Sequence, residues 1–280
     1  MALDIVRLHP LFGAEIRGVS IGRDLPPAER RAIHEAVTTY GVAVIRGQAL
    51  SDEDLGEFAM SLGQTWRREG LTQTDRGVFR LSNMAADGGL LPVDDRSIRA
   101  NLANELWHTD GTFAQPGASV SLLHSRVIPP EGGDTEFCDT RVAYEALDEA
   151  MRQRIASLVG RHSFAHSRAQ TGYTEFTAER RAASVPHRLV RPHAASGRTA
   201  LCLASHICEI EGLTPDATAD LLDALNATAT APERVHVHSW RVGDLVMWDN
   251  RCTMHRVRPY AMTVHPRDMR SVRLVDTAAS

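Results

Sequence analysis

The first quarter of the chain alternates between helical and strand-like patterns of apolar residues. Residues 28–39 follow two prolines and end at Gly41, an arrangement typical of a helix with proline at its start and glycine at its end. The next segment, residues 42–45, is short, apolar and partly β-branched, which predicts a buried strand. Ser51 stands three residues before an acidic side chain, as in a capping box, and predicts a second helix over residues 52–62.

Short strand-like segments dominate the rest of the chain. The predicted strands are residues 119–127, 135–138, 200–204, 235–240, 244–248 and 269–275. Helices are expected over residues 141–158 and 215–225. Residues 67–101 have no clear period and are rich in Gly, Asp and Arg, so we expect a long surface loop that covers a site. The mixture lacks βαβ alternation and a linker, which predicts one α+β domain, mainly β in its core, spanning residues 1–280.

Composition narrows the possible chemistry. All 31 basic residues are arginine, so a Schiff-base lysine and a P-loop lysine are excluded, and any fixed positive charge in a site is a guanidinium. The 35 acidic residues give a net charge of −4, which predicts neither nucleic acid nor membrane as a partner. The four cysteines form no C-x-x-C pair and the N-terminus shows no signal pattern, so we expect a cytoplasmic protein with reduced thiols.

A histidine and an aspartate near the middle of the chain are the first candidates for chemistry. His108 and Asp110 are two residues apart, so on a strand their side chains point to the same face. They supply two thirds of a 2-His-1-carboxylate triad, which binds Fe(II) and leaves positions open. The second histidine must come from elsewhere in the chain. His255, late in a strand–turn–strand pattern, is the best candidate, and His236 with His238 form a rival pair.

A cosubstrate with two acid groups requires a fixed cation and a hydroxyl group near such a metal. Past His255 the chain offers Arg267, Arg270 and Arg273, and Thr135 begins a predicted strand after a diglycine turn. A guanidinium fork and one hydroxyl together make a complete clamp for a carboxylate. Three further histidines are candidates for the pocket wall or for structural roles: His187, His193 and His206.

These residues lie within blocks that extend over nearly the whole chain. The blocks are residues 8–12, 101–144, 196–198, 211–213, 243–252 and 255–256. Together they resemble the Fe(II)- and 2-oxoglutarate-dependent dioxygenases of the taurine dioxygenase superfamily, and most of all the branch that oxidises 2,4-dichlorophenoxyacetate. The resemblance implies a double-stranded β-helix, or jelly roll, with flanking helices. It also implies that His108, Asp110 and His255 bind Fe(II), with 2-oxoglutarate and O2 as cosubstrates.

The resemblance further implies roles for residues around the metal. Thr135 and Arg267 match the pair that holds the distal carboxylate of 2-oxoglutarate. Asn104 and Trp248 match positions beside the iron and the cosubstrate, and Asn104 is a candidate for contacting the substrate.

The spacing after His255 departs from that of the relatives by one residue. With Arg267 as the cosubstrate arginine, the position of the family's second arginine, which grips the substrate's acid group, falls on Ser271. Counting directly from His255 instead brings Arg270 near that position. Arg270 is therefore a candidate for binding either the cosubstrate or the substrate, and Ser271 for binding the substrate.

The resulting hypothesis is a dioxygenase that hydroxylates a small aromatic molecule bearing a carboxylate, such as an aryloxyalkanoate, with succinate and CO2 as co-products. Two alternatives stay open: hydroxylation or desaturation of a biosynthetic intermediate, and a jelly-roll metal protein that binds small molecules without oxidising them. The expected partner is a small-molecule substrate, and a homo-oligomer is left open.

Overall fold

The computed structural model describes residues 3–67 and 71–277; residues 68–70, which belong to the predicted loop 67–101, lie outside the described residues. The helices are α1 (Pro27–Tyr40), α2 (Asp52–Leu62), α3 (Arg96–Asn101), α4 (Thr140–Ala146), α5 (Glu149–Ile155), α6 (Phe164–Ala169), α7 (Ala178–Ala182) and α8 (Pro215–Ala229), with 3-10 turns η1 (Leu102–Glu105) and η2 (Pro232–Arg234). The strands are β1 (Asp4–Arg7), β2 (Ala14–Arg17), β3 (Val42–Ile45), β4 (Phe79–Ser82), β5 (Ala118–Val127), β6 (Thr135–Asp139), β7 (Val159–His162), β8 (Val185–Arg188), β9 (Val190–His193), β10 (Arg198–Leu201), β11 (Ile207–Ile210), β12 (Val235–His238), β13 (Leu245–Asp249), β14 (Thr253–Val257) and β15 (Asp268–Val275).

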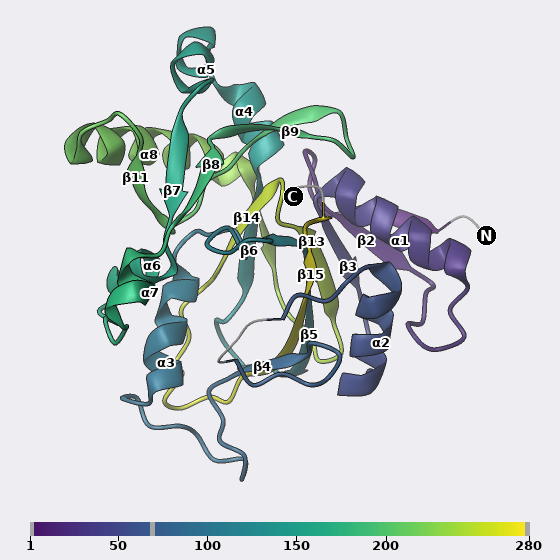
Figure 1. The fold of residues 1–280 in the computed structure, drawn as a ribbon. Coiled ribbons are helices and arrows are strands. Elements are labelled where there is room, and N and C mark those ends of the chain that lie inside the picture. Colours follow the sequence, from purple (N-terminus) through teal and green to yellow (C-terminus); the bar gives the residue numbers. More distant parts are fainter. Residues whose placement is uncertain (1–2, 68–70, 278–280) are drawn as a thin grey trace.

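Two β-sheets make up the centre of the molecule (Figure 1). The larger has seven strands in the order β1-β2-β3-β13-β5-β15-β4, and the smaller has three in the order β12-β6-β14. Phe137 on β6 packs against Trp248 on β13, with ring centroids 5.5 Å apart, and both belong to one buried apolar cluster. The two sheets therefore share a core on their facing sides.

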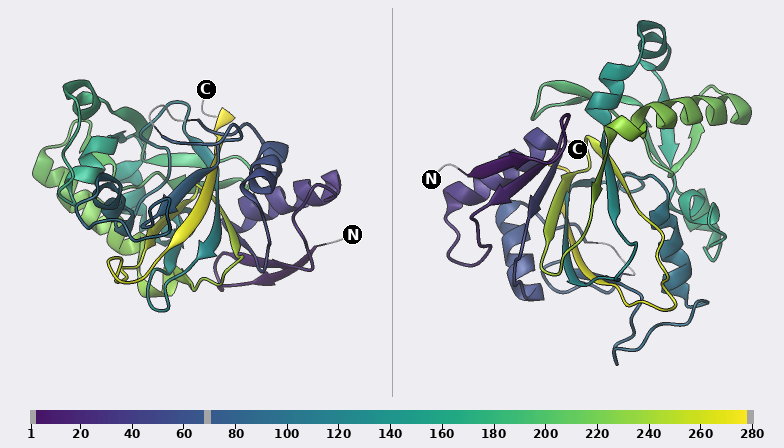
Figure 2. Two further views of the ribbon diagram at one scale, coloured as in Figure 1. Left: turned by 90° about the horizontal axis from the view of Figure 1, so that it is seen from below. Right: turned by 180° about the vertical axis from the view of Figure 1, so that it is seen from behind.

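Strand β13 shows how one strand contributes to two cores. Because successive side chains point to opposite faces, Leu245 and Met247 pack in the cluster formed with α1 and α2. Val246 and Trp248 pack instead toward the smaller sheet. Helices α1 and α2 thus cover the outer face of the larger sheet, as the view from behind in Figure 2 also shows.

The outer side of the smaller sheet is covered by later parts of the chain. Cys138 on β6 and Met254 on β14 are fully buried in a third apolar cluster, which includes Leu221 and Leu225 of α8. The short sheets β11-β7-β8 and β10-β9 lie on this side (Figure 1). Four layers result, namely helices α1 and α2, the larger sheet, the smaller sheet and an outer layer of helices and two small sheets.

The structure confirms most of the predicted elements. Helices α1 and α2 and strand β3 lie where expected, and Ser51 with Asp54 makes both hydrogen bonds of the capping box. The predicted helix 141–158 is wrong in one respect, because it is two helices. The side chain of Asp148 accepts a hydrogen bond from the backbone N–H of Met151 and so caps a new helix, α5.

The segment 67–101 is not a plain loop. It contains strand β4, which pairs with β15 at the edge of the larger sheet, and helix α3. Both elements are short, and their stability comes from tertiary contacts that a search for periodicity does not detect. None of the helices in the described part of the chain is long and apolar enough to cross a membrane.

Candidate metal centre

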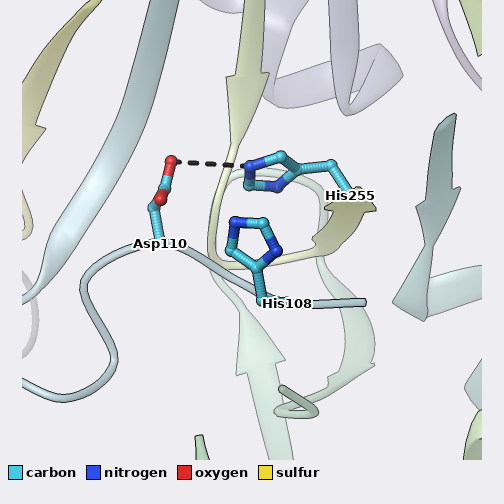
Figure 3. A group of neighbouring side chains, drawn as sticks. All are labelled: His108, Asp110 and His255. Atoms are coloured by element: carbon cyan, nitrogen blue, oxygen red, sulfur yellow. Dashed lines mark ion pairs between the residues drawn. The ribbon is translucent and has the colours of Figure 1, made fainter. Parts of the chain in front are cut away.

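The side chains of His108, Asp110 and His255 point toward one another (Figure 3), and all three line one cavity. His255 lies on β14, and its backbone exchanges two hydrogen bonds with that of His108, with N···O distances of 3.0 and 2.8 Å. One ligand atom from each of the three side chains lies within 4.8 Å of the others. His108 forms an isolated bridge and not part of a regular strand, and Asp110 already lies in a turn.

The hydrogen bonds around these side chains leave suitable atoms for a metal. The Nδ1 atom of His108 donates to the carbonyl oxygen of Leu106 over 2.7 Å, which leaves Nε2 with a free lone pair. Ser121 donates to Oδ2 of Asp110 over 2.7 Å, and this oxygen is 3.7 Å from Nε2 of His255. Two imidazoles and one carboxylate, oriented in this way, fit Fe(II) and leave coordination positions open.

The electrostatics favour the forms of these side chains that bind a metal. Burial lowers the pKa of His108 and lowers that of His255 further, so both imidazoles are neutral near pH 7. Burial alone would raise the pKa of Asp110, but the guanidinium of Arg273, 2.6 Å away, and the two histidines outweigh it, so the carboxyl pKa is lowered. A deprotonated carboxylate and neutral imidazoles are what metal binding requires.

Thr135 and Arg267 lie together in the same cavity as the metal-binding cluster. The cavity has a volume of about 780 Å³. A terminal N–H of Arg267 donates to the carbonyl of Gly133 over 3.4 Å, whereas its Nε is buried without a hydrogen-bond partner among the described residues. The hydroxyl of Thr135 accepts a hydrogen bond from Nε1 of Trp240 over 3.0 Å, so its proton is available for another acceptor.

Arg270 and Ser271 occupy opposite faces of β15. Ser271 is buried and lines the cavity. Arg270 points to the helix-covered face, where it makes ion pairs with Asp52 and Asp268 at 3.1 and 2.8 Å. The structure thus brings Ser271 to the site but not Arg270, because neighbouring residues of a strand face opposite ways.

Asn104 and Trp248, which the resemblance placed beside the metal, both line the cavity. The ring of Trp248 is 4.6 Å from that of His255, measured between centroids. The three other candidate histidines do not line this cavity: His193 hydrogen-bonds Asp249, His206 packs against His108 and Phe113, and His187 approaches the carbonyl of Thr112.

The rival pair on β12 lies apart from the metal-binding cluster. His238 approaches Asp244 at 3.3 Å, and His236 packs edge-on against Phe12. A second group of possible ligands exists in the described part of the chain, formed by His193, Asp249 and Cys252. The carboxylate of Asp249 already receives three hydrogen bonds from Arg251, one from the backbone N–H and two from the guanidinium, and one from His193, so these partners satisfy the buried carboxylate.

Several residues that line the cavity were not predicted from the sequence. Arg168 on α6 lines the cavity, as do Phe79, Phe164, Tyr173 and Phe176. Arg273 was a candidate for a cosubstrate clamp, yet its guanidinium binds Asp110. The phase of β15 indicates that Arg273 shares a face with Ser271, but no local pattern marks Arg168, because its position depends on how α6 packs onto the sheets.

Fold and cavity together define a non-haem metal site built between two sheets, and the comparisons agree. The model of the family described as Taurine catabolism dioxygenase TauD, TfdA family matches residues 4–273. The chain is 39% identical to an alpha-ketoglutarate-dependent 2,4-dichlorophenoxyacetate dioxygenase of Burkholderia sp. (strain RASC), covering 96% of this chain and 93% of that one. It is 34% identical to an (S)-phenoxypropionate/alpha-ketoglutarate-dioxygenase of Sphingobium herbicidovorans, covering 94% and 91%.

A solved structure gives the same result. AAD-2 in complex with Mn(II) and N-oxalylglycine superposes with a TM-score of 0.93 at 40% identity, covering 99% of each chain. The chain therefore belongs to the TauD/TfdA dioxygenase family. It is a 2-oxoglutarate-dependent dioxygenase that uses Fe(II), 2-oxoglutarate and O2. This finding excludes the alternative of a metal protein that does not oxidise its ligand.

Proposed function

We propose that this dioxygenase hydroxylates a small aromatic acid of the aryloxyalkanoate class. The observation that carries the proposal is one cavity that combines the His108, Asp110 and His255 cluster, the Thr135 and Arg267 pair and a wall of aromatic side chains. The proposal includes a double-stranded β-helix as the core, and a single domain over residues 1–280.

His108, Asp110 and His255 are the proposed iron ligands. When bound, the iron and 2-oxoglutarate supply the oxidising chemistry, in which O2 converts 2-oxoglutarate to succinate and CO2 and one oxygen atom enters the substrate. The chain's own part is to hold these ligands. Ser121 fixes one oxygen of Asp110 and Arg273 the other, and the carbonyl of Leu106 fixes the imidazole of His108.

Arg267 and Thr135 are the proposed binding residues for the distal carboxylate of 2-oxoglutarate. Support comes from the buried Nε of Arg267, which lacks a partner among the described residues, and from the free proton of the Thr135 hydroxyl. A carboxylate that accepts both donors satisfies a buried cation, whose charge is otherwise costly. Asn104 and Ser271 line the remaining part of the cavity and are proposed to contact the substrate.

The substrate class is supported by relatives named for 2,4-dichlorophenoxyacetate and for phenoxypropionate. Hydroxylation of the carbon between the ether oxygen and the carboxylate gives a hemiacetal, which collapses to a phenol and a 2-oxoacid. The segments 71–83 and 95–101 contribute many lining residues, which supports a role for this part of the chain as a cover over the site. The four free cysteines are in accord with a reducing, cytoplasmic setting.

An anaerobic titration tests the cofactor half of the proposal. Fe(II) and 2-oxoglutarate are added without oxygen, and the visible charge-transfer band of the chelate is recorded. We expect the band in the unmodified chain and its loss in H108A, D110A and H255A. A folded protein that binds iron without giving the band would overturn the assignment. Succinate release with a panel of aryloxyalkanoates then tests the substrate half.

A further inference from the structure

We propose that Arg168 on α6 binds the carboxylate of the substrate, with Phe164, Tyr173 and Phe176 holding its aromatic body. The inference rests on the proposed function and deepens it by naming the residues that select an aromatic monoanion. It differs from the expectation that this carboxylate is bound from β15, because the side chain at position 271 is a serine and Arg270 faces the opposite side of the sheet.

Arg168 is a cation of the cavity that has no acidic partner among the described residues. Its only hydrogen bond to a side chain is donated to Oδ1 of Asn104 over 3.2 Å, and no ion pair joins it to a carboxylate in the described part of the chain. Its Nε is buried and has no hydrogen-bond partner among these residues. Burial lowers the pKa of Arg168 to about 10, so the side chain is still charged at neutral pH. An incoming carboxylate satisfies this fork of donors.

The other arginines that line the cavity have partners of their own. Arg80 makes an ion pair with Asp268 at 2.7 Å, Arg96 donates a hydrogen bond to the hydroxyl of Tyr173 over 2.6 Å, and the guanidinium of Arg180 lies 5.4 Å from the ring centroid of Phe164. Arg273 contacts Asp110 at 2.6 Å, so its charge is balanced within the metal-binding cluster. Arg267 lies beside Gly133, and the nearby acid that acts on it is Asp134. The charges that act on Arg168 come from Arg273 and Asp110 instead. Arg168 therefore offers a positive position with other neighbours than those of Arg267, beside Asn104 and Phe164, and we assign this position to the acid group of the substrate.

The region beside Arg168 also offers a surface for an aromatic ring. Phe164 lies under the guanidinium, 4.7 Å from ring centroid to Cζ. Phe176 packs edge-on against both Phe164 and Tyr173, with centroids 5.9 and 5.1 Å apart, and all three line the cavity. An aryl group beside this cluster gains both apolar burial and edge-to-face contacts. A single guanidinium next to an aromatic wall matches an aromatic acid with one negative charge.

The test compares an acid with its uncharged analogue. Phenoxyacetate and phenoxyacetamide are titrated by calorimetry into the anaerobic protein loaded with Fe(II) and 2-oxoglutarate. We expect the unmodified chain to prefer the acid by roughly tenfold or more, as charged hydrogen bonds predict. R168M should lose this preference, and R168K should recover part of it. R270M, which removes an arginine outside the cavity, serves as the control and should keep the preference.

The charge-transfer band shows whether Fe(II) and 2-oxoglutarate bind, and the preference for the acid shows whether Arg168 binds the substrate. If R168M keeps both the band and the preference for the acid, the inference is wrong. Loss of the band in R168M alone, or equal affinity of the unmodified chain for acid and amide, also overturns it. Absence of the band in the unmodified chain would overturn the proposed function itself.

Discussion

At the scale of single residues, direction along a strand decides which arginine serves the site. Arg270 and Arg273 are both near His255 in sequence spacing, but only Arg273 faces the metal-binding cluster. Because side chains alternate between the two faces of β15, Arg270 and Arg273 point to opposite sides of the sheet. Counting residues from His255 cannot distinguish the two faces if the count is uncertain by one residue. His108 and Asp110 were predictable because their motif is local, whereas His255 lies far away in sequence and was singled out among rival histidines by the family resemblance. Arg168 was not predictable, since its role arises from packing between distant segments.

Replacing Arg267 should act mainly on cosubstrate binding. R267M removes the cation of the proposed clamp, so we expect the dissociation constant of 2-oxoglutarate to rise by about 10- to 100-fold, the range for a hydrogen-bonded charge. The intensity of the anaerobic charge-transfer band against cosubstrate concentration measures this. R270M should leave the constant near that of the unmodified chain. A larger effect in R270M than in R267M would contradict the assignment made from the face of β15.

His236 should make stability depend on pH. Burial, together with the nearby charges of His238, His9 and Arg46, lowers its pKa to about 4, against 6.5 for the unperturbed side chain. Between these values the unfolded chain binds a proton that the folded chain does not, so stability falls as pH falls from 6.5 toward 4.

Urea unfolding at several pH values across this window measures the effect. H236Q removes the titrating group, and its free energy of unfolding should fall less steeply with decreasing pH than that of the unmodified chain. Parallel curves for the two proteins would show that the folded-state pKa of His236 is not depressed.

At the scale of elements, the turn before β6 controls the position of the cosubstrate clamp. Gly132 has a φ of +71°, and a Cβ there would come within 2.5 Å of the carbonyl oxygen of Pro259. Gly133, the next residue, receives the hydrogen bond from Arg267. A side chain at position 132 must therefore shift this turn. The turn contains the Gly133 carbonyl, which accepts the hydrogen bond from Arg267, and it leads into Thr135.

G132A should lower both stability and 2-oxoglutarate affinity. The left-handed conformation alone costs about 1–3 kcal/mol for a residue with a side chain. The matched control is G197A, because Gly197 has a φ of +67° and nothing within 4 Å of the added Cβ. We expect G197A to lose stability only. Equal cosubstrate affinities in the two variants, measured by the band titration, would rule out the proposed coupling between turn and clamp.

The elements that sequence patterns predicted best are those with their own local signals. Helix α2 has a complete capping box, and β13 has an uninterrupted apolar run, so both were predicted nearly to the residue. Strand β4 lacks such a signal and helix α3 has only the capping residue Asp95, so β4 depends on pairing with β15 and α3 on its packing at the cavity wall. The helix expected over 141–158 is two helices because Asp148 caps the start of the second one. Aspartate is a good N-cap residue, and the apolar pattern alone does not show where a new helix begins.

At the scale of the whole molecule, the two sheets bring together residues from all parts of the chain. Asp110 precedes β5 in the larger sheet, His255 lies on β14 in the smaller sheet, and Arg168 lies on α6 in the outer layer. The fold and the site depend on the same packing, because Trp248 contacts Phe137 of the smaller sheet and also lines the cavity. The general α+β architecture was predictable from short strands without βαβ alternation, whereas the pairing order of the sheets was not.

The most direct test of the central claim is the coupling of two products in one reaction. The protein is supplied with Fe(II), 2-oxoglutarate, O2 and 2,4-dichlorophenoxyacetate, and succinate and 2,4-dichlorophenol are quantified together, with H255A as the inactive control. The account predicts that both products form in equal amounts and that neither forms in H255A. Succinate without any phenol from this or other aryloxyalkanoates would contradict the proposed substrate class, and phenol formation that does not require 2-oxoglutarate would contradict the account as a whole.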